Sequence, residues 1–193
     1  MSMDRREAIK RTALMMGGLV FAPSALGVLN GCQARGGGDW NPENFNRSQA
    51  DLISTLSDVI LPATDTPGAT DVGVPAFVEE MVFTAYDEDA RDTFMSGLEA
   101  FNQLARDEYG SDFIDLSPED QYAFASEQNR LAVGGDYDDP GTAYFLQMKE
   151  LTMLGFFTSE RGAKEVLQYV KVPGRYEACI PLEEAGNGKT WAI

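Results

Sequence analysis

The sequence predicts an all-α protein: a compact bundle of about six helices with an irregular C-terminal tail, preceded by an export signal. Apolar residues recur at three- and four-residue spacing through most of residues 48–170, which is the period of an amphipathic helix. Helix-start and helix-stop residues separate these segments, as at Ser117-Pro118 and Gly110. Once the signal is removed, 162 residues remain, which suits a single domain.

Residues 1–31 have the features of an export signal. Two adjacent arginines, Arg5 and Arg6, are followed by Lys10 and then by a mostly apolar segment, 12–29, that several glycines dilute. Such a segment is marginal as a membrane span. A pair of arginines before a weakly apolar segment resembles signals of the twin-arginine (Tat) pathway, which exports folded proteins. An ordinary signal peptide that happens to contain adjacent arginines is the alternative.

The end of this signal resembles a lipoprotein box. In Leu29-Asn30-Gly31-Cys32, cleavage before Cys32 would leave a thiol that is lipidated and held in a membrane. A simple cleaved signal followed by a stray cysteine is the alternative. Residues 32–47, which contain three consecutive glycines, then read as a flexible tether between the lipid and the domain.

The helical domain is predicted to span residues 48–193. Its best-defined helix is 88–109, in which four apolar residues from Phe94 to Ala105 share one face. The predicted helices are 48–60 (capped by Ser48), 75–86, 88–109, 118–133, 142–157 and a short one at 159–170. The remaining residues show no strong period, so we expect an irregular tail.

Three details of this domain bear on function. On the helix 75–86, Glu79 and Glu80 are expected to face solvent, as carboxylates usually do. The helix 142–157 is apolar almost all round, which predicts either a central, buried helix or one that partly faces a partner protein. In the acidic loop 134–141, the run Asp-Tyr-Asp-Asp-Pro at 136–140 lacks the glycine and terminal glutamate of a calcium-binding loop, so no metal site is predicted there.

The least ordinary segment is the loop 61–77, which contains three prolines and several Thr and Asp residues. Its residues 65–68, Asp-Thr-Pro-Gly, predict a turn in which the Asp and Thr side chains bond the local backbone and the glycine adopts a positive φ. A shaped loop on a rigid scaffold is suited to recognition, although it also suits a structural corner. The candidate docking residues are Pro62, Thr64, Asp65, Thr66, Pro67 and Gly68.

Composition excludes several classes of function. The chain carries −16, and since residues 1–31 carry +2, residues 32–193 carry −18. This charge repels phosphate backbones, so no nucleic-acid partner is expected; the acidity serves either solubility or a basic partner. The chain has no histidine and no Cys-x-x-Cys pair, which excludes a zinc ribbon, an iron–sulfur cluster and covalent c-type haem within it.

No catalytic, cofactor-binding or metal-binding residue is predicted in this chain. It contains no nucleotide-binding glycine motif after a strand and no nucleophile-elbow sequence. An enzyme that relies on the carboxylates of Asp65 and Asp71 is the remaining catalytic alternative.

Several motifs resemble those of the gluconate 2-dehydrogenase subunit 3 family. The longest is the run 58–69, Asp-Val-Ile-Leu-Pro-Ala-Thr-Asp-Thr-Pro-Gly-Ala, followed by Gly-Val-Pro at 73–75. The resemblance continues in the same order through 151–160, 172–176, 178–182 and 189–192, and so covers about 48–193.

This resemblance implies a non-catalytic small subunit of a membrane-associated dehydrogenase for sugars, sugar acids or polyols. In that family the large subunit is a flavoprotein of the glucose–methanol–choline type, which holds FAD, and a cytochrome c subunit often takes the electrons. The small subunit carries the Tat signal for both chains, so the Tat translocase is also an expected partner. These features imply a periplasmic protein. The lipoprotein box is less usual for the founding members of the family, and it suggests that this chain also holds the complex at the membrane through the lipid on Cys32.

The second cysteine, Cys179, is left over in an exported protein and so predicts either an intersubunit disulfide with the flavoprotein or a buried free thiol. Two other readings of the whole chain stay open. One is a structural lipoprotein with a different periplasmic partner, and the other is the independent carboxylate enzyme.

Overall fold

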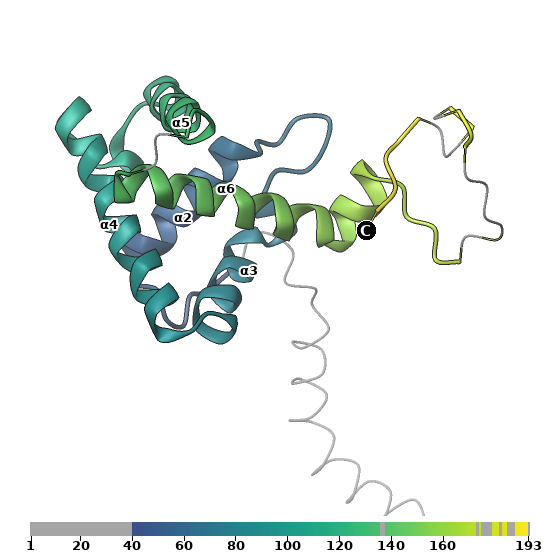
Figure 1. Ribbon diagram of the computed structural model, residues 1–193, viewed down its shortest axis with the longest axis horizontal. Helices are drawn as coiled ribbons and strands as arrows, with labels where there is room; N and C mark the ends of the chain where they lie inside the picture. The colour runs from purple at the N-terminus through teal and green to yellow at the C-terminus, as the bar shows by residue number, and fades with distance from the viewer. Residues whose placement is uncertain are drawn as a thin grey trace, which may run out of the picture. The chain divides into compact units, whose positions relative to one another are not determined.

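The computed structural model describes residues 40–135, 138–172, 174, 179–181, 183–184 and 188–192, all within one compact unit at 35–193. In this part of the chain the fold is all-α, as predicted, with no strand (Figure 1). The α-helices are α2 (Arg47–Ile60), α3 (Val74–Glu80), α4 (Glu88–Tyr109), α5 (Pro118–Val133) and α6 (Pro140–Thr158). Shorter turns are η1 (Thr70–Val72), η2 (Met81–Ala85), η3 (Phe113–Asp115) and η4 (Gly162–Val166).

Most predicted helix boundaries agree with the structure. The bounds of α4 and α5 are those predicted, and the predicted helix 75–86 is α3 continued by the π-turn η2. The first helix differs at its start, because Asn46 rather than Ser48 caps α2. The Asn46 side chain accepts a hydrogen bond from Gln49 N, and the Gln49 side chain accepts one from Asn46 N.

The predicted helix 159–170 is wrong in extent, since only residues 160–166 are helical and the last five of them form the π-turn η4. Ser159 ends α6 with an extended backbone, and its Oγ donates to Phe156 O at 2.6 Å. At Gly162 a Cβ atom would lie only 1.9 Å from that same carbonyl oxygen, so the turn needs glycine. Beyond η4, Gln168 forms an isolated parallel bridge with Trp191. In this bridge Gln168 N donates to Thr190 O, and Ala192 N donates to Gln168 O.

Helix α6 is the central element of the bundle and packs against α2, α3, α4 and α5 (Figure 1). Its N-terminal and middle parts contribute Tyr144, Phe145, Met148 and Leu151 to the core. A helix that is apolar on every side buries itself among several neighbours, because each face then loses contact with water. The prediction of a central helix is therefore confirmed for this part of α6.

Two glycines let α4 and α6 approach closely. A Cβ atom on Gly97 of α4 would lie 2.9 Å from Tyr144 Cβ, and one on Gly141 of α6 would lie 2.9 Å from the backbone of Phe101. The Tyr144 ring is fully buried at this crossing, with its centroid 5.1 Å from that of Phe94. Larger side chains at either glycine would force the two helices apart.

We expect Gly141→Ala to destabilise the protein by about 1–2 kcal/mol, although alanine favours a helix by roughly 1 kcal/mol on propensity alone. The reason is that the added methyl meets backbone atoms of α4, which cannot rotate away. Chemical denaturation monitored by circular dichroism measures this effect. Ser96→Ala, on the exposed side of α4, is the control and should stay within about 0.5 kcal/mol of the parent. A stabilised Gly141→Ala protein would contradict the close crossing.

The segment before α2 is fixed to the bundle by a buried carboxylate. Glu79 of α3 is only 8% exposed, so the expectation that it faces solvent is wrong. Its Oε1 accepts hydrogen bonds from the backbone N–H of Glu43 (2.9 Å) and Asn44 (2.7 Å), and its Oε2 accepts one from Trp40 Nε1 (2.9 Å). Residues 40–46 therefore lie on the domain rather than in the tether that we predicted at 32–47.

The environment of Glu79 favours its charged form. Burial of the carboxylate is the largest single influence and acts to raise the pKa. Hydrogen bonds from Asn44, Trp40, Glu43 and Phe45 together outweigh it, so the net pKa is lowered from the ordinary 4.5. A carboxylate whose pKa is lower in the folded state stabilises that state above its unfolded pKa.

We expect Glu79→Gln to cost about 1–3 kcal/mol of folding free energy at neutral pH, because the amide cannot satisfy all of these donors. The difference from the parent should shrink as the pH falls below 4.5 and through the lower pKa of the folded state, where the parent carboxylate also becomes neutral. Urea unfolding at several pH values, followed by tryptophan fluorescence, measures this difference. The neighbouring Glu80→Gln, at an exposed position, should have little effect at any pH.

Candidate partner-docking site

The loop after α2 is closed at its base by a carboxylate and two backbone hydrogen bonds. Asp58, in the last turn of α2, accepts from Thr70 N at 2.9 Å and from Thr70 Oγ1 at 2.7 Å. Ala69 N donates to Leu61 O at 2.9 Å, and Val74 N donates to Ala69 O at 3.1 Å. The loop is thus held between the end of α2 and the start of α3, so its shape is fixed rather than mobile.

The turn chemistry inside the loop differs from the prediction. Gly68 does not have a positive φ; it is needed because a Cβ atom there would lie 2.9 Å from Ala63 N. The positive φ of 82° belongs to Gly73, which joins η1 to α3. Within the described part of the chain the Asp65 carboxylate makes no hydrogen bond, and it is Asp71 that accepts from Gly68 N, at 2.9 Å.

The six predicted docking residues divide into two groups. Pro67 and Gly68 are buried, and Thr66 is half-buried, so this side of the loop is a structural corner. Pro62, Thr64 and Asp65 are exposed and form the tip of the loop. The loop therefore combines both of the roles that the sequence left open, with only its tip available to a partner.

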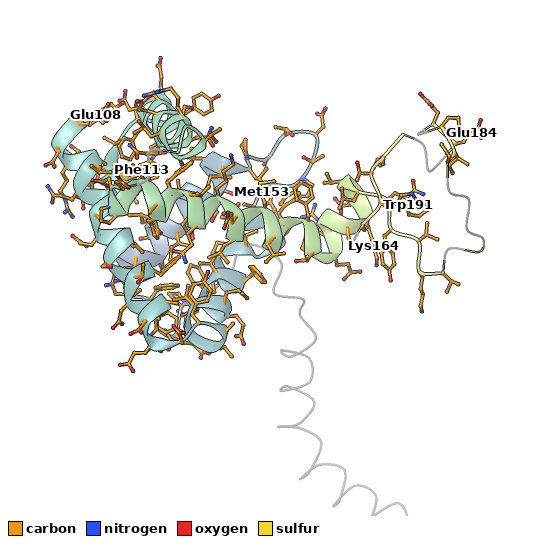
Figure 2. The ribbon with its side chains drawn as sticks, viewed as in Figure 1. Glu108, Phe113, Met153, Lys164, Glu184 and Trp191 are labelled. Carbon is orange, nitrogen blue, oxygen red and sulfur yellow. The ribbon has the colours of Figure 1, made fainter. Side chains whose placement is uncertain are left out.

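The far end of α6 lies against this loop region and also exposes apolar side chains. Gly155 of α6 meets the ring of Phe77, since a Cβ atom there would lie 2.6 Å from Phe77 Cδ1. In the same helix Met153 and Leu154 are 42% and 45% exposed. Figure 2 shows Met153 on α6, with Lys164 of η4 and Trp191 of the tail following toward the C-terminal end.

The exposed apolar side chains continue beyond α6. We call Met153, Leu154, Tyr169, Val170 and Val172 the apolar end of the domain; all five are exposed by at least 40%. The sequence indicates part of this surface, because α6 is apolar on every side and its neighbours do not cover all of its apolar side chains. Neighbouring exposed apolar side chains, such as Met153 and Leu154 on α6, are candidates for contact with another protein.

An arginine joins the loop to η4. Arg161 donates from Nη1 to Asp71 O at 3.4 Å and pairs through Nε with Glu165 Oε1 at 2.9 Å. The hydrogen bond that Arg161 donates to the Glu165 carboxylate raises the pKa of Arg161, so the guanidinium stays charged. The loop, α6 and η4 are therefore linked side by side.

Comparison with known families decides what this domain is. Residues 47–174 match the family model described as gluconate 2-dehydrogenase subunit 3. The chain belongs to this family. Neither a search of curated proteins nor a search of solved structures found a match.

The match covers α2 to α6, the loop and the apolar end of this gluconate 2-dehydrogenase subunit 3 protein. It stops at residue 174, so the resemblance that we expected as far as 193 is confirmed only to that point. The motifs at 178–182 and 189–192 lie beyond the match. Members of this family are subunits of a dehydrogenase complex, so the chain associates with a larger assembly.

The structure describes only some of the other candidate residues. Arg5, Arg6, Lys10 and Cys32 lie outside the residues that the structure describes. Cys179 is an exposed free thiol, so the alternative of a buried thiol is wrong. Among the described residues, no group of three metal-ligating side chains occurs, and no helix has the length and apolar character needed to cross a membrane.

Sequence reasoning missed three carboxylates that build this site. Asp58 and Glu79 accept backbone N–H groups from other segments, and Asp71 accepts one from Gly68 within the same loop, whereas we expected Glu79 in solvent and weighed Asp71 as a catalytic group. For Asp58 a signal existed, because it opens the longest family motif. For Glu79 the sequence offers no signal, since its donors become neighbours only in the folded chain.

We expect Asp58→Ala to destabilise the protein by about 1–3 kcal/mol, because it leaves the Thr70 N–H and hydroxyl without their acceptor. Asp65→Ala, at the loop tip, is the matched control and should change stability by less than about 0.5 kcal/mol. Thermal unfolding of the two variants measures both effects. Equal losses would contradict the division of the loop into a corner and a tip.

Proposed function

We propose that this chain is the non-catalytic small subunit of a periplasmic FAD-dependent dehydrogenase for sugars, sugar acids or polyols. The observation that carries the proposal is the match of the whole helical domain to gluconate 2-dehydrogenase subunit 3, joined to an exposed apolar end on a chain of net charge −16. The FAD and the hydride chemistry belong to a separate flavoprotein chain of the glucose–methanol–choline type. A cytochrome c subunit is the expected electron acceptor.

In this proposal the small subunit stabilises the flavoprotein by covering part of its surface. The apolar end supplies buried contact area, and apolar area removed from water is the main favourable term in association. The loop tip at Pro62, Thr64 and Asp65 adds polar contacts. Because the loop is already held by Asp58, little conformational entropy is lost when it binds.

The double variant Met153→Glu with Leu154→Glu should lower recovery of the flavoprotein at least tenfold, since both charges would be buried against the partner. Val133→Glu, at a 71% exposed position on α5, is the control and should leave the complex intact. The measurement is affinity purification of the tagged full chain from its native membrane, with flavin absorbance of the eluate. If the parent chain brings down no flavoprotein, the alternative of a lipoprotein with another periplasmic partner replaces this proposal.

The same purified complex tests the role of Cys179, for which we propose a disulfide with the flavoprotein. Support comes from its exposure, which leaves the thiol accessible to another chain. On a gel run without reductant the two subunits should migrate together, and Cys179→Ser should separate them. A small subunit that migrates alone from the parent complex would refute the disulfide.

We further propose that residues 1–31 direct the folded, FAD-loaded complex to the Tat translocase and that Cys32 anchors it by a lipid. The support is the sequence pattern of Arg5, Arg6 and Lys10, followed by the lipoprotein box. A flavoprotein without a signal of its own would then reach the periplasm only together with this chain.

Replacing Arg5 and Arg6 together by lysine should leave both subunits in the cytoplasm, because the twin-arginine pathway reads that pair. Cys32→Ala should allow export but release the complex from the membrane and abolish labelling by a palmitate analogue. Cell fractionation with flavoprotein activity measures both results. Label that persists in Cys32→Ala would refute the anchor, and export of the lysine variant would refute the Tat route.

A further inference from the structure

A small surface pocket of about 180 Å³ opens between α2, α5 and α6. An apolar cavity of about 150 Å³ is large enough to take up benzene, so this pocket has room for one large side chain. Its lining residues are Val59, Ile60, Tyr122, Ala125, Ser126, Asn129, Phe145 and Lys149. None of them is acidic, although the chain has 31 acidic residues.

The inner part of the pocket is apolar. Phe145 and Ala125, which are 3% and 5% exposed, form the part of the lining that belongs to the core. Val59 and Ile60, at the end of α2, are half-buried beside them. Because Ala125 and its neighbour Ser126 are small, α5 leaves a hollow at a point where a larger side chain would fill it.

The outer part of the pocket is polar and positively charged. Lys149 donates from Nζ to Asn129 Oδ1 at 2.6 Å, which fixes the ammonium at the pocket. Among the described residues Lys149 makes no ion pair, whereas Arg47, Arg161 and Lys164 each pair with a carboxylate one helical turn away. A half-buried ammonium that has no ion-pair partner and lies next to an apolar hollow can bind an anion.

We propose that this pocket binds a segment of the dehydrogenase large subunit in which a carboxylate lies beside an apolar side chain. The apolar group fills the hollow against Phe145, and the carboxylate accepts a hydrogen bond from Lys149 Nζ. Tyr122, which is 67% exposed, covers the bound segment from the rim. The pocket adjoins the docking loop directly, because Ile60 is followed by Leu61 at the loop base.

The choice of occupant rests on the proposed function, but the chemistry of the pocket does not. Charge complementarity selects the carboxylate, since a second cationic group would meet Lys149 and a neutral group would leave its ammonium without a counter-charge. The size of the hollow limits the apolar part to about one side chain. Binding of a small probe and assembly of the complex therefore test two separate parts of the proposal.

The first experiment titrates the purified full chain in detergent with N-acetyl-leucine and, as its neutral twin, N-acetyl-leucinamide, using NMR shifts of α5 and α6 residues. The acid should bind about tenfold or more tightly than the amide, because a hydrogen bond to a charged group contributes more than a neutral one. Lys149→Met keeps the apolar stem and should remove this preference, while Lys171→Met, in the exposed tail, should keep it. Equal binding of acid and amide by the parent would overturn the pocket.

A second variant addresses the hollow. Ser126→Leu fills it from an exposed position on α5 and should abolish binding of both probes, whereas Ala123→Leu, exposed elsewhere on that helix, should not. Unchanged far-ultraviolet circular dichroism shows that each variant is folded. Probe binding that survives Ser126→Leu would also overturn the pocket.

The last measurement tests the occupant. Lys149→Met and Ser126→Leu should each lower flavoprotein recovery from the native membrane, with Lys171→Met and Ala123→Leu at the parent level. If the parent complex forms and both pocket variants assemble normally while probe binding is lost, the large subunit is not the occupant. If the parent recovers no flavoprotein, the proposed function fails and the occupant with it, whatever the probe result.

Discussion

The close crossing of α4 and α6 is the most extensive contact between two helices of this domain and fixes the central helix. Gly97 and Gly141 remove side chains where the two helices meet, so Tyr144 and Phe101 pack between them without separating the backbones. Once α6 is fixed in this way, its remaining faces are covered by α2, α3 and α5. Those helices do not cover all sides of the C-terminal part of α6, so Met153 and Leu154 are exposed there. The exposure of Met153 and Leu154 thus follows from where α6 is held.

Carboxylates hold the non-helical segments on either side of α2 against the bundle. Glu79 holds the chain before α2, Asp58 closes the loop after it, and Asp71 binds within the loop. Each of them accepts backbone N–H groups, and such charge-assisted hydrogen bonds are stronger than neutral ones. Part of the strong acidity of this chain is therefore structural. Other described carboxylates, such as Glu88 and Asp89, are exposed, and surface charge of this sign repels phosphate backbones.

The features that we propose for partner binding lie on the surface of this protein. The loop tip, the apolar end and the Lys149 pocket all lie next to elements that the core fixes in place, so a partner meets a preformed surface. This arrangement suits a chain that belongs with a larger dehydrogenase complex, as its family does. The loop shows how one segment serves both purposes, since Pro67 and Gly68 complete the fold while Pro62 and Asp65 remain available to a partner.

The sequence by itself determined the all-α class, the bounds of α4 and α5 and the central place of α6, because these follow from local spacing and helix caps. Its longest motif also identified the family over 47–174. Only the tertiary structure decided that Glu79 is buried, that Gly68 is required by contact with Ala63 and that the short helix after Ser159 ends at Val166. The Lys149 pocket belongs to the same group, since it needs α2, α5 and α6 together. For Glu79 and the pocket, the neighbouring atoms come from segments that are distant in the sequence and meet only when the helices pack, whereas Gly68 and Ala63 meet through the path of the loop itself.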